Sequence, residues 1–230
     1  NGNDGTIVGA TWDEDGAPLM VAGCTDPYAD NYDSDANFDD GSCSGYPDNG
    51  EYVLSFDGSD DYISIGNSSD FDVNSELTIT TMIQPSSDDQ YASIIDRMPS
   101  SGVGYRLNIR GDSQNGEVWA AFGNASNSQL ASSDENGWSL NEWLCLTGVW
   151  KNNNYVKLYI NGQLIDSIAT ELSFDTDNPL EFARMNYDNY DGEYFSGNMD
   201  YVHIWDHVLT ISEIQSYINA PPSGSESGLL

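Results

Sequence analysis

Apolar and polar residues alternate with a period of two in one segment after another from about residue 50 onward. The clearest case is Tyr155–Ile160, which is followed by Asn161-Gly162 and then by residues 163–168. Asn-Gly between two alternating runs is a strong hairpin signal, because both turn residues tolerate a positive φ. Alternating segments bounded by Gly, Asn and Asp are typical of strands with one buried face. About a dozen such segments predict an all-β fold, an antiparallel β-sandwich.

One short helix is expected near the end of the chain. Residues 210–213 read Thr-Ile-Ser-Glu, which is a capping box, in which the threonine and glutamate side chains satisfy each other's backbone N–H groups. Ile211, Ile214 and Ile218 would then form the apolar face of this helix.

Residues 24–43 place six aspartates between two cysteines, with no lysine or arginine among them. Carboxylates crowded in this way repel one another unless a hard cation neutralises them, and calcium takes oxygen ligands. The predicted calcium ligands in this segment are Asp26, Asn31, Asp33, Asp35, Asn37, Asp39 and Asp40. The alternative is a disordered acidic loop that is held only by a disulfide.

The chain has three cysteines, which is an odd number. Cys24 and Cys43 flank the polar segment and are predicted to form a disulfide. Cys145 lies in an apolar strand pattern and is expected to be a buried free thiol. A disulfide indicates an oxidising compartment, so the protein is expected to be secreted or exposed on a cell surface.

The net charge is −32, from 6 lysines and arginines against 38 aspartates and glutamates. This excludes nucleic acid as a partner, because a phosphate backbone requires a basic face, and it argues against anionic membranes. Aspartate outnumbers glutamate, which fits turns and calcium loops, whereas adaptation to a salty habitat is a compatible explanation. No apolar run is long enough to span a membrane.

Five stretches carry a family resemblance: NGNDGTIVGATW at residues 1–12, LSFDGSDDYI at 54–63, KLYING at 157–162, FSGNMDYVHIW at 195–205 and VLTISEI at 208–214. In this order they resemble the laminin-G-like and pentraxin-like branch of the concanavalin A-like lectin/glucanase sandwich domains. The resemblance implies a jelly-roll sandwich with one short C-terminal helix.

The resemblance covers residues 1–22 and 47–219, which are expected to form the sandwich. Residues 23–46 resemble the thrombospondin type 3-like calcium loops of large secreted marine bacterial proteins and would be an insertion. Residues 220–230 are expected to be a linker or the start of a next repeat, because Ser227 to Leu230 resemble the lead-in to the first strand of such domains. Both ends look cut from a longer, tandem-repeat protein.

Pentraxin-like domains carry a ligand-binding calcium site between a loop Asp pair and a later acidic loop. The resemblance therefore implies calcium ligands at Asp88, Asp89, Asn186, Asp188 and Asp191. Calcium there could accept two hydroxyls of a sugar, with Tyr187 and Tyr190 stacked on its ring. This chain has Asn and Asp in the later loop where that family tends to place Glu and Gln, and the alternative is an ordinary pair of polar loops.

A third acidic cluster is expected because the resemblance makes two strands neighbours: the Asp-Asp-Tyr strand that begins at Asp60 and the Met-Asp-Tyr strand at residues 199–205. The acids that could share a structural cation are Asp57, Asp60, Asp61 and Asp200. Aspartates that merely stabilise a turn are the alternative.

Trp119, Tyr105 and Trp138 could line a groove, and core or edge packing is the alternative for these three.

Related sandwich hydrolases carry a Glu-x-Asp-x-x-Glu strand, which this sequence lacks, and no nucleophile elbow is present. The leading prediction is a non-catalytic, calcium-dependent adhesion or carbohydrate-binding module of a larger surface protein. Its expected partners are a glycan, a cell-surface protein or neighbouring copies of itself. The alternatives are a structural repeat of an extracellular fibre, assembled by strand sharing with purely structural calcium, and a glycan hydrolase with an unrecognised acid pair.

Overall fold

The computed structural model describes residues 10–11, 20–25, 29, 31–44, 53–66, 71, 75–87, 89–98, 102–112, 116–124, 127–133, 137–175, 178–187, 190–220, 222 and 224–230. The chain divides into two compact units, Asn1–Tyr52 and Val53–Leu230. Each unit is described by itself.

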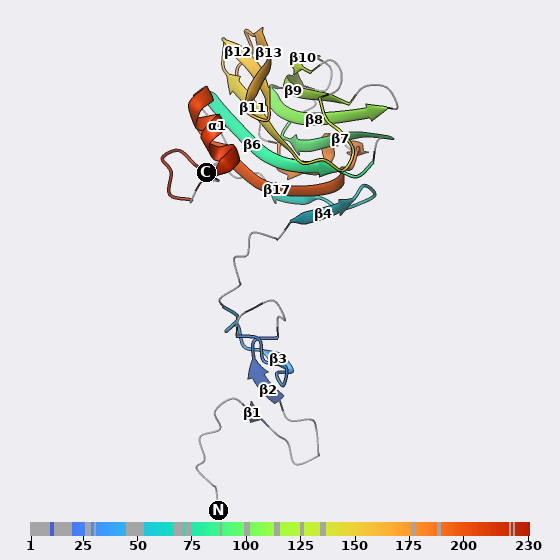
Figure 1. Ribbon diagram of the computed structural model, residues 1–230, viewed down its shortest axis with the longest axis vertical. Helices are drawn as coiled ribbons and strands as arrows, with labels where there is room; N and C mark the ends of the chain where they lie inside the picture. Colours follow the sequence, from blue (N-terminus) through green and yellow to red (C-terminus); the bar gives the residue numbers. More distant parts are fainter. Residues whose placement is uncertain are drawn as a thin grey trace, which may run out of the picture. The chain divides into compact units, whose positions relative to one another are not determined.

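The larger unit contains two six-stranded antiparallel sheets (Figure 1). Sheet I has the order β10 (Asn127–Ser132), β9 (Glu117–Asn124), β8 (Gly104–Asp112), β7 (Asp89–Asp96), β14 (Leu180–Phe182) and β5 (Ile63–Gly66). Sheet II has the order β13 (Gln163–Ala169), β12 (Tyr155–Ile160), β11 (Leu144–Lys151), β6 (Glu76–Pro85), β17 (Ser196–Trp205) and β4 (Leu54–Asp57). The predicted all-β antiparallel sandwich is therefore confirmed.

Alternation along the strands builds the core between the sheets. In β6, Leu77, Ile79 and Ile83 are fully buried and belong to the main core cluster. The Trp150 ring lies in the same core, where its Nε1 donates a hydrogen bond of 2.8 Å to the carbonyl of Ala121 in sheet I. The predicted Asn161-Gly162 turn joins β12 and β13, with φ of 49° and 71° at its two residues.

Helix α1 (Ile211–Asn219) follows β17 in the chain (Figure 1). It begins with the predicted capping box. Thr210 Oγ1 accepts from the Glu213 N–H, and the Glu213 carboxylate accepts from the Thr210 N–H at 2.7 Å. A second apolar cluster lies on the face of sheet II that points away from the main core, called here the outer face of sheet II. It contains Val149, Tyr159, Trp205, Leu209 and Ile214.

The apolar face of α1 differs from the prediction at one position. Ile214 is buried and Ile218 is half-buried, but Ile211 is 48% exposed. Ile211 is the first residue of the helix, and the apolar cluster is instead extended by Tyr217, whose ring stacks on Trp205 with centroids 5.3 Å apart. Among the described residues, no helix is long and apolar enough to cross a membrane.

The end of the chain folds back on sheet II. Leu229 forms an antiparallel bridge with Trp205. The Asp206 N–H donates to the Gly228 carbonyl at 2.9 Å, and the Leu230 N–H donates to the Ile204 carbonyl at 2.8 Å. These residues therefore lie beside the end of β17.

The smaller unit contains β1 (Ala10–Thr11), β2 (Met20–Gly23) and β3 (Phe38–Asp39). Strand β2 pairs antiparallel with β1 and parallel with β3. Cys24 and Cys43 form the predicted disulfide, and Cys145 in the larger unit is the buried free thiol. The described strands of sheets I and II all come from residues 54–205, and the predicted sandwich boundaries at residues 22 and 47 remain a prediction.

Candidate functional site

A polar hollow of about 340 Å³ lies at one edge of the sandwich. It is lined by Asp57, Gly58, Ser87, Tyr91, Glu193, Tyr194 and Ser196. These residues come from the end of β4, the segment that leads into β7, β7 itself and the segment that leads into β17. Three parts of the chain that are distant in sequence therefore meet at this hollow.

Sheet II positions one wall of the hollow. Ser196 at the start of β17 lies opposite Asp57 at the end of β4. The Ser86 N–H donates to the Ser196 carbonyl at 3.0 Å, and the two serine hydroxyls are 2.9 Å apart. Gly58 has a φ of +79°, and a Cβ there would lie 2.8 Å from the Ser196 Cβ. Any other residue at position 58 would push Ser196 away, so the close approach of the turn to Ser196 requires glycine.

The other wall is formed where the chain leaves sheet I and returns. After β14, the Ala183 N–H donates to the Ile94 carbonyl at 3.0 Å, and the chain then forms the hairpin of β15 (Met185–Tyr187) and β16 (Tyr190–Gly192). It returns at Glu193, whose carbonyl accepts from the Ser93 N–H at 3.2 Å. Ala183 and Glu193 both have positive φ, 65° and 53°. A positive φ at a non-glycine residue is a backbone strain that the surrounding structure must hold in place, and such strain is common at functional sites.

Tyr91 gives the hollow an aromatic side. Its side chain is 36% exposed, and its ring lies edge-on to Trp119 with centroids 5.4 Å apart. Partial burial raises the pKa of the Tyr91 phenol, and the Glu193 carboxylate raises it further. The hydroxyl therefore stays protonated at neutral pH and can donate a hydrogen bond to a ligand.

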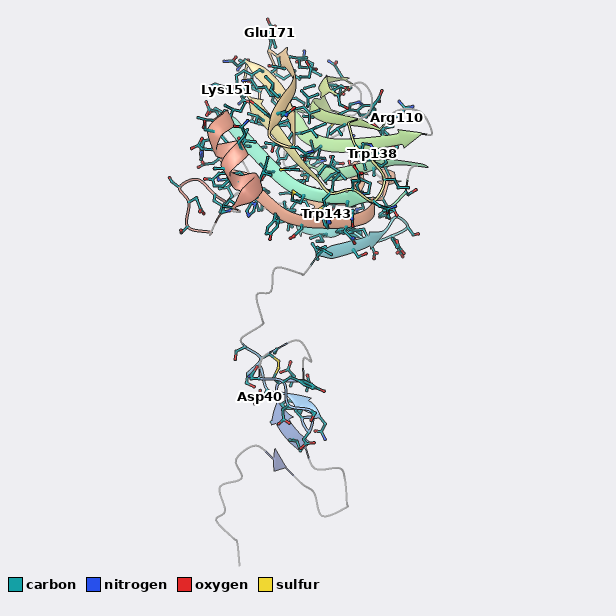
Figure 2. All side chains as sticks on the ribbon, in the orientation of Figure 1. Asp40, Arg110, Trp138, Trp143, Lys151 and Glu171 are labelled. Atoms are coloured by element: carbon teal, nitrogen blue, oxygen red, sulfur yellow. A yellow bond between two sulfur atoms is a disulfide. The ribbon has the colours of Figure 1, made fainter. Side chains whose placement is uncertain are left out.

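Of the three aromatic residues predicted to line either a groove or the core, Trp119 contacts Tyr91 of the hollow. Tyr105 is 1% exposed and belongs to the main core, as the core alternative predicted. Trp138 is half-buried against that core, and its Nε1 donates to the Arg110 carbonyl at 3.2 Å (Figure 2). The aromatic surface beside the hollow is therefore the Tyr91–Trp119 pair.

Polar side chains continue from this pair across sheet I. Asn108 lies opposite both Ser93 and Trp119, and its Oδ1 accepts from the Ser93 hydroxyl at 3.3 Å. Arg106 forms a buried ion pair of 2.9 Å with Asp96. Such a pair must stay intact, because removing one partner leaves the other charge buried and uncompensated. These two contacts join side chains of β7 and β8.

The predicted acidic cluster beside the hollow is present in part. Asp57, Asp60 and Asp61 are exposed, and one carboxylate oxygen from each lies within 4.8 Å of the others. The Asp57 Oδ1 accepts from the Ser59 N–H at 2.7 Å, and the Asp61 Oδ2 accepts from the Asp57 N–H at 3.0 Å. These aspartates therefore stabilise the turn and also form an acidic cluster. Three hard oxygen donors with this spacing could bind a metal ion.

Asp200 lies outside this cluster. The resemblance implied that the Asp-Asp-Tyr strand and the Met-Asp-Tyr strand are neighbours, which is wrong: β5, the strand after Asp61, pairs with β14 in sheet I, whereas β17 lies in sheet II. The strand beside β17 is β4, and the register places Ser196 opposite Asp57. Asp200 lies four residues further along β17, opposite Met82 of β6, and its Oδ1 accepts from the Tyr201 N–H at 2.8 Å. A strand advances about 3.3 Å per residue, so this shift removes Asp200 from the turn.

Two residues predicted as calcium ligands in the smaller unit have structural hydrogen bonds. The Asn31 Nδ2 donates to the Ser42 carbonyl at 2.7 Å, and its Oδ1 accepts from the Ser44 N–H at 2.8 Å. The Asn37 Oδ1 accepts from the Val21 N–H at 3.0 Å. These amides tie the loop to itself and to β2.

The aspartates of this loop make short local turns. Asp33, Asp39 and Asp40 each accept from the N–H two residues ahead, at 2.9 Å, and Asp35 is exposed like them. Among the described residues, these carboxylates do not converge as closely as those of Asp57, Asp60 and Asp61. Asp26 lies outside the described residues, and calcium binding by this loop remains a prediction.

The loops implied to hold a sugar-binding calcium are described only in part. Asp88 and Asp188 lie outside the described residues. The backbone of Asp89 begins β7, and Asn186 pairs with Asp191 and Tyr187 with Tyr190 in the β15–β16 hairpin, but the side chains of these five residues lie outside the described part. Ser87 and Glu193, which flank the two loops, both line the hollow.

Sequence reasoning missed Tyr91, Glu193, Tyr194 and Ser196 as site residues. Tyr91 carried a usable signal, because it occupies an outward position in an alternating strand two residues after Asp89. Glu193 carried none, because its position depends on a left-handed backbone that its residue type does not favour.

The fold and the hollow define a sandwich of the lectin type, with a polar and aromatic recess at the edge of two six-stranded sheets. The sequence model of the laminin G-like family described as the concanavalin A-like lectin/glucanases superfamily matches residues 57–215, more than half of the chain. The chain belongs to this family. Among curated proteins, no sequence matches it significantly.

Several solved structures share the fold. A SAP-like pentraxin from Limulus polyphemus is 15% identical, with a TM-score of 0.54, over 72% of this chain and 80% of that one. Domain 4 of the extracellular arabinanase AbnA from Geobacillus stearothermophilus, in complex with arabinotriose, is 15% identical, with a TM-score of 0.55 over 71% and 75%. The binding domain of botulinum neurotoxin DC in complex with SialylT is 17% identical, with a TM-score of 0.55 over 75% and 45%.

Calcium should stabilise the larger unit if the Asp57–Asp60–Asp61 cluster binds it. At an excess of about a hundredfold over the dissociation constant, we expect the melting temperature to rise by about 5 °C, since a bound ion stabilises only the folded state. Asp60→Asn should remove most of this rise. Asp60 suits the test, because in the described part of the structure its carboxylate supports no turn hydrogen bond of the kind made by Asp57 and Asp61.

Differential scanning calorimetry with calcium and with chelator checks this expectation. Asp175→Asn is the matched control, because Asp175 is also exposed and pairs through its backbone with Val103. A melting temperature that chelator leaves unchanged would contradict calcium binding by this cluster.

Proposed function

We propose that this protein is a non-catalytic, calcium-dependent carbohydrate-binding module of a larger, tandem-repeat surface protein that mediates adhesion. The observation that carries the proposal is the polar hollow at the sandwich edge, with the Tyr91–Trp119 pair on one side and the acidic cluster at Asp57 on the other. Recesses of this size with a few polar groups and an aromatic wall are typical of sites for small polar ligands.

The lining supplies both kinds of contact that a sugar needs. The Tyr91 ring can cover the apolar face of a pyranose or furanose, and its hydroxyl can donate to a ring substituent. The Asp57 and Glu193 carboxylates can accept from sugar hydroxyls, and the Ser87 hydroxyl can do either. Hydrogen bonds to charged acceptors are the stronger ones, so these two acids would orient the ligand.

Calcium would be held by Asp57, Asp60 and Asp61, whose donor set consists only of hard oxygen atoms. When bound, the ion would supply a positive charge that sugar hydroxyls can approach as ligands. Asp57 belongs both to the cluster and to the lining of the hollow, so it would couple the two.

The structural neighbours support a carbohydrate ligand. The AbnA domain was solved with arabinotriose, and the botulinum neurotoxin DC binding domain was solved with SialylT. The Cys24–Cys43 disulfide supports an extracellular location, because disulfides persist in oxidising compartments. A glycan or a glycosylated surface protein is therefore the proposed partner.

Tyr91→Ala should lower the affinity for a bound oligosaccharide by about tenfold, because the aromatic stacking surface of the hollow is lost. Isothermal titration calorimetry with arabinotriose and with a sialylated trisaccharide, each with calcium and with chelator, measures this effect. Trp143→Ala is the matched control, because Trp143 is 40% exposed and lies outside the hollow (Figure 2).

Three outcomes would each contradict a different part of the proposal. If neither sugar nor any member of a glycan array binds, the protein is not a carbohydrate-binding module. If a sugar binds equally well to wild type and Tyr91→Ala, binding occurs elsewhere than in the hollow. If chelator does not change the affinity, calcium has no part in sugar binding, and only the hollow remains as the binding site.

A further inference from the structure

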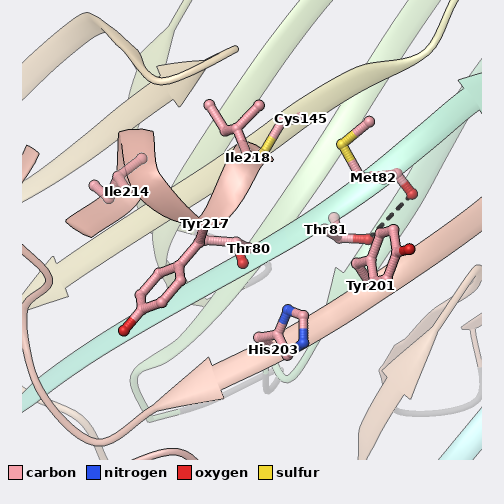
Figure 3. Close-up of a pocket in the computed structure, with 9 residues that line it drawn as sticks. All are labelled: Thr80, Thr81, Met82, Cys145, Tyr201, His203, Ile214, Tyr217 and Ile218. Carbon is pink, nitrogen blue, oxygen red and sulfur yellow. Dashed lines mark hydrogen bonds between the residues drawn. The ribbon is translucent and has the colours of Figure 1, made fainter. Parts of the chain in front are cut away.

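A second cavity, of about 60 Å³, opens on the outer face of sheet II beside α1 (Figure 3). Its lining residues are Thr80, Thr81, Met82, Cys145, Tyr201, His203, Ile214, Tyr217 and Ile218. The carbohydrate proposal does not use any of them, and most of the wall is apolar.

The strand register explains why a cavity forms here. On the outer face of sheet II, Cys145 lies opposite Met82, and Thr80 lies opposite His203. Helix α1 covers the neighbouring apolar cluster around Val149 and Trp205, and its residues Ile214, Tyr217 and Ile218 form one wall of the cavity. Figure 3 shows Ile218 and Tyr217 of the helix on one side and Tyr201 on the other.

A β-bulge places Tyr201 at the rim. The register between β17 and β6 shifts between Asp200 and His203, and Tyr201 has a φ of +48°. Its side chain is 42% exposed, and its ring stacks on His203 with an interplanar angle of 12°. Bulges re-aim side chains, and a tyrosine with a positive φ is strained, so this ring is held at the surface against the local backbone preference.

The charges around the cavity are negative. Burial lowers the pKa of His203, which is therefore neutral at pH 7, whereas the carboxylates of Glu226 and Asp200 act on the ring in the opposite direction. No lysine or arginine is among the lining residues of the cavity. The four arginines are in or next to strands of sheet I. Lys151 and Lys157 lie on the outer face of sheet II, where Lys151 pairs with Glu76 at 2.5 Å and Lys157 lies over the Tyr155 ring at 4.1 Å. Burial also raises the pKa of the Cys145 thiol to about 11, so that the wall it forms is uncharged.

We propose that this cavity binds a lysine side chain of a partner protein. The four-carbon stem would lie against Met82, Cys145 and Ile218, which are apolar and uncharged. The ammonium group would lie over the exposed Tyr201 ring, near the Asp200 and Glu226 carboxylates. A lysine fits the small opening better than an arginine, because its ammonium is compact and the guanidinium is a wide planar group.

The test compares N-acetyl-lysine amide with N-acetyl-norleucine amide, which has the same stem length and lacks the ammonium. We expect the lysine probe to shift the methyl NMR signals of Met82 and Ile218 in the full chain, with an affinity at least about threefold higher than that of the norleucine probe. Tyr201→Ala should abolish this preference, and Tyr201→Phe should retain it. Tyr32→Ala, which removes an equally exposed tyrosine of the smaller unit, should leave it unchanged.

Equal affinities for the two probes, or signal shifts only at other positions, would overturn the proposal. The n-butylammonium ion serves as a third probe. This ion has the stem and the ammonium of lysine without a backbone, and it should bind about as tightly as the lysine amide, because every proposed contact is made by the side chain. If it binds no better than the norleucine probe, the proposal is contradicted. None of these results depends on sugar binding at the Tyr91 hollow.

Discussion

Trp150→Ala should lower the free energy of unfolding of the larger unit by about 4 kcal/mol. Trp150 is fully buried, and its ring lies 5.5 Å from that of Tyr105 in the main core. Truncation would leave a large cavity between the sheets and would remove the hydrogen bond from Nε1 to the Ala121 carbonyl. Urea unfolding followed by far-UV circular dichroism measures the change.

Trp143→Ala is the matched control and should change stability by less than about 0.5 kcal/mol, because Trp143 is 40% exposed. A loss below about 1 kcal/mol for Trp150→Ala would show that the core closes around the missing ring, contrary to the tight packing expected of a protein interior.

Gly148 sharpens this test. A Cβ at Gly148 would lie 2.2 Å from the nearest atom of the Trp150 ring, so that Gly148→Ala alone should also be destabilising. In the Trp150→Ala background the added methyl group would enter the vacated space. We expect the two losses to be less than additive, since the two residues share one volume.

Removal of the Cys24–Cys43 disulfide should unfold the smaller unit and leave the larger one folded. Closing a loop of about 20 residues is worth about 3 kcal/mol. Among its described residues, only Cys24 and Ala29 are buried, so the apolar contribution to its stability is small. A Cys24→Ser/Cys43→Ser variant should be cut rapidly by protease within the first 52 residues, while the circular dichroism melting curve of the sandwich stays in place.

The same variant separates the two interpretations of the acidic loop. If calcium restores protease resistance in the absence of the disulfide, the loop binds the ion. Resistance that persists without either calcium or disulfide would contradict the structural role of the bridge. Cys145→Ser, which removes the cysteine of the larger unit, is the control.

The sequence predicted what depends on local chemistry. Period-two alternation located the strands, Asn161-Gly162 marked a hairpin because its dihedral angles suit those residue types, and the Thr210–Glu213 pair marked the helix start. These signals are short-range, and tertiary context did not alter them. The resemblance then supplied the sandwich that joins them.

Such local signals could not predict the hollow, because it forms where segments that are distant in the sequence pair with one another. Nothing local to Ser196 shows that it lies opposite Asp57, and the step of four residues to Asp200 follows only from the register of β17. Glu193 and Tyr201 adopt left-handed dihedral angles that their residue types disfavour, so sequence preference points away from the observed backbone.

The buried thiol of Cys145 provides a way to measure how often the folded protein opens. Cys145 is the free cysteine of the chain and lies under the edge of α1 with 6% exposure. A thiol reagent too large to enter the cavity of about 60 Å³ beside Cys145 can reach the thiol only while α1 or sheet II is transiently open, so its labelling rate under native conditions reports how often that happens. Ligands of the hollow and of the cavity can thus be compared by how much each slows the labelling of Cys145, without heat or denaturant.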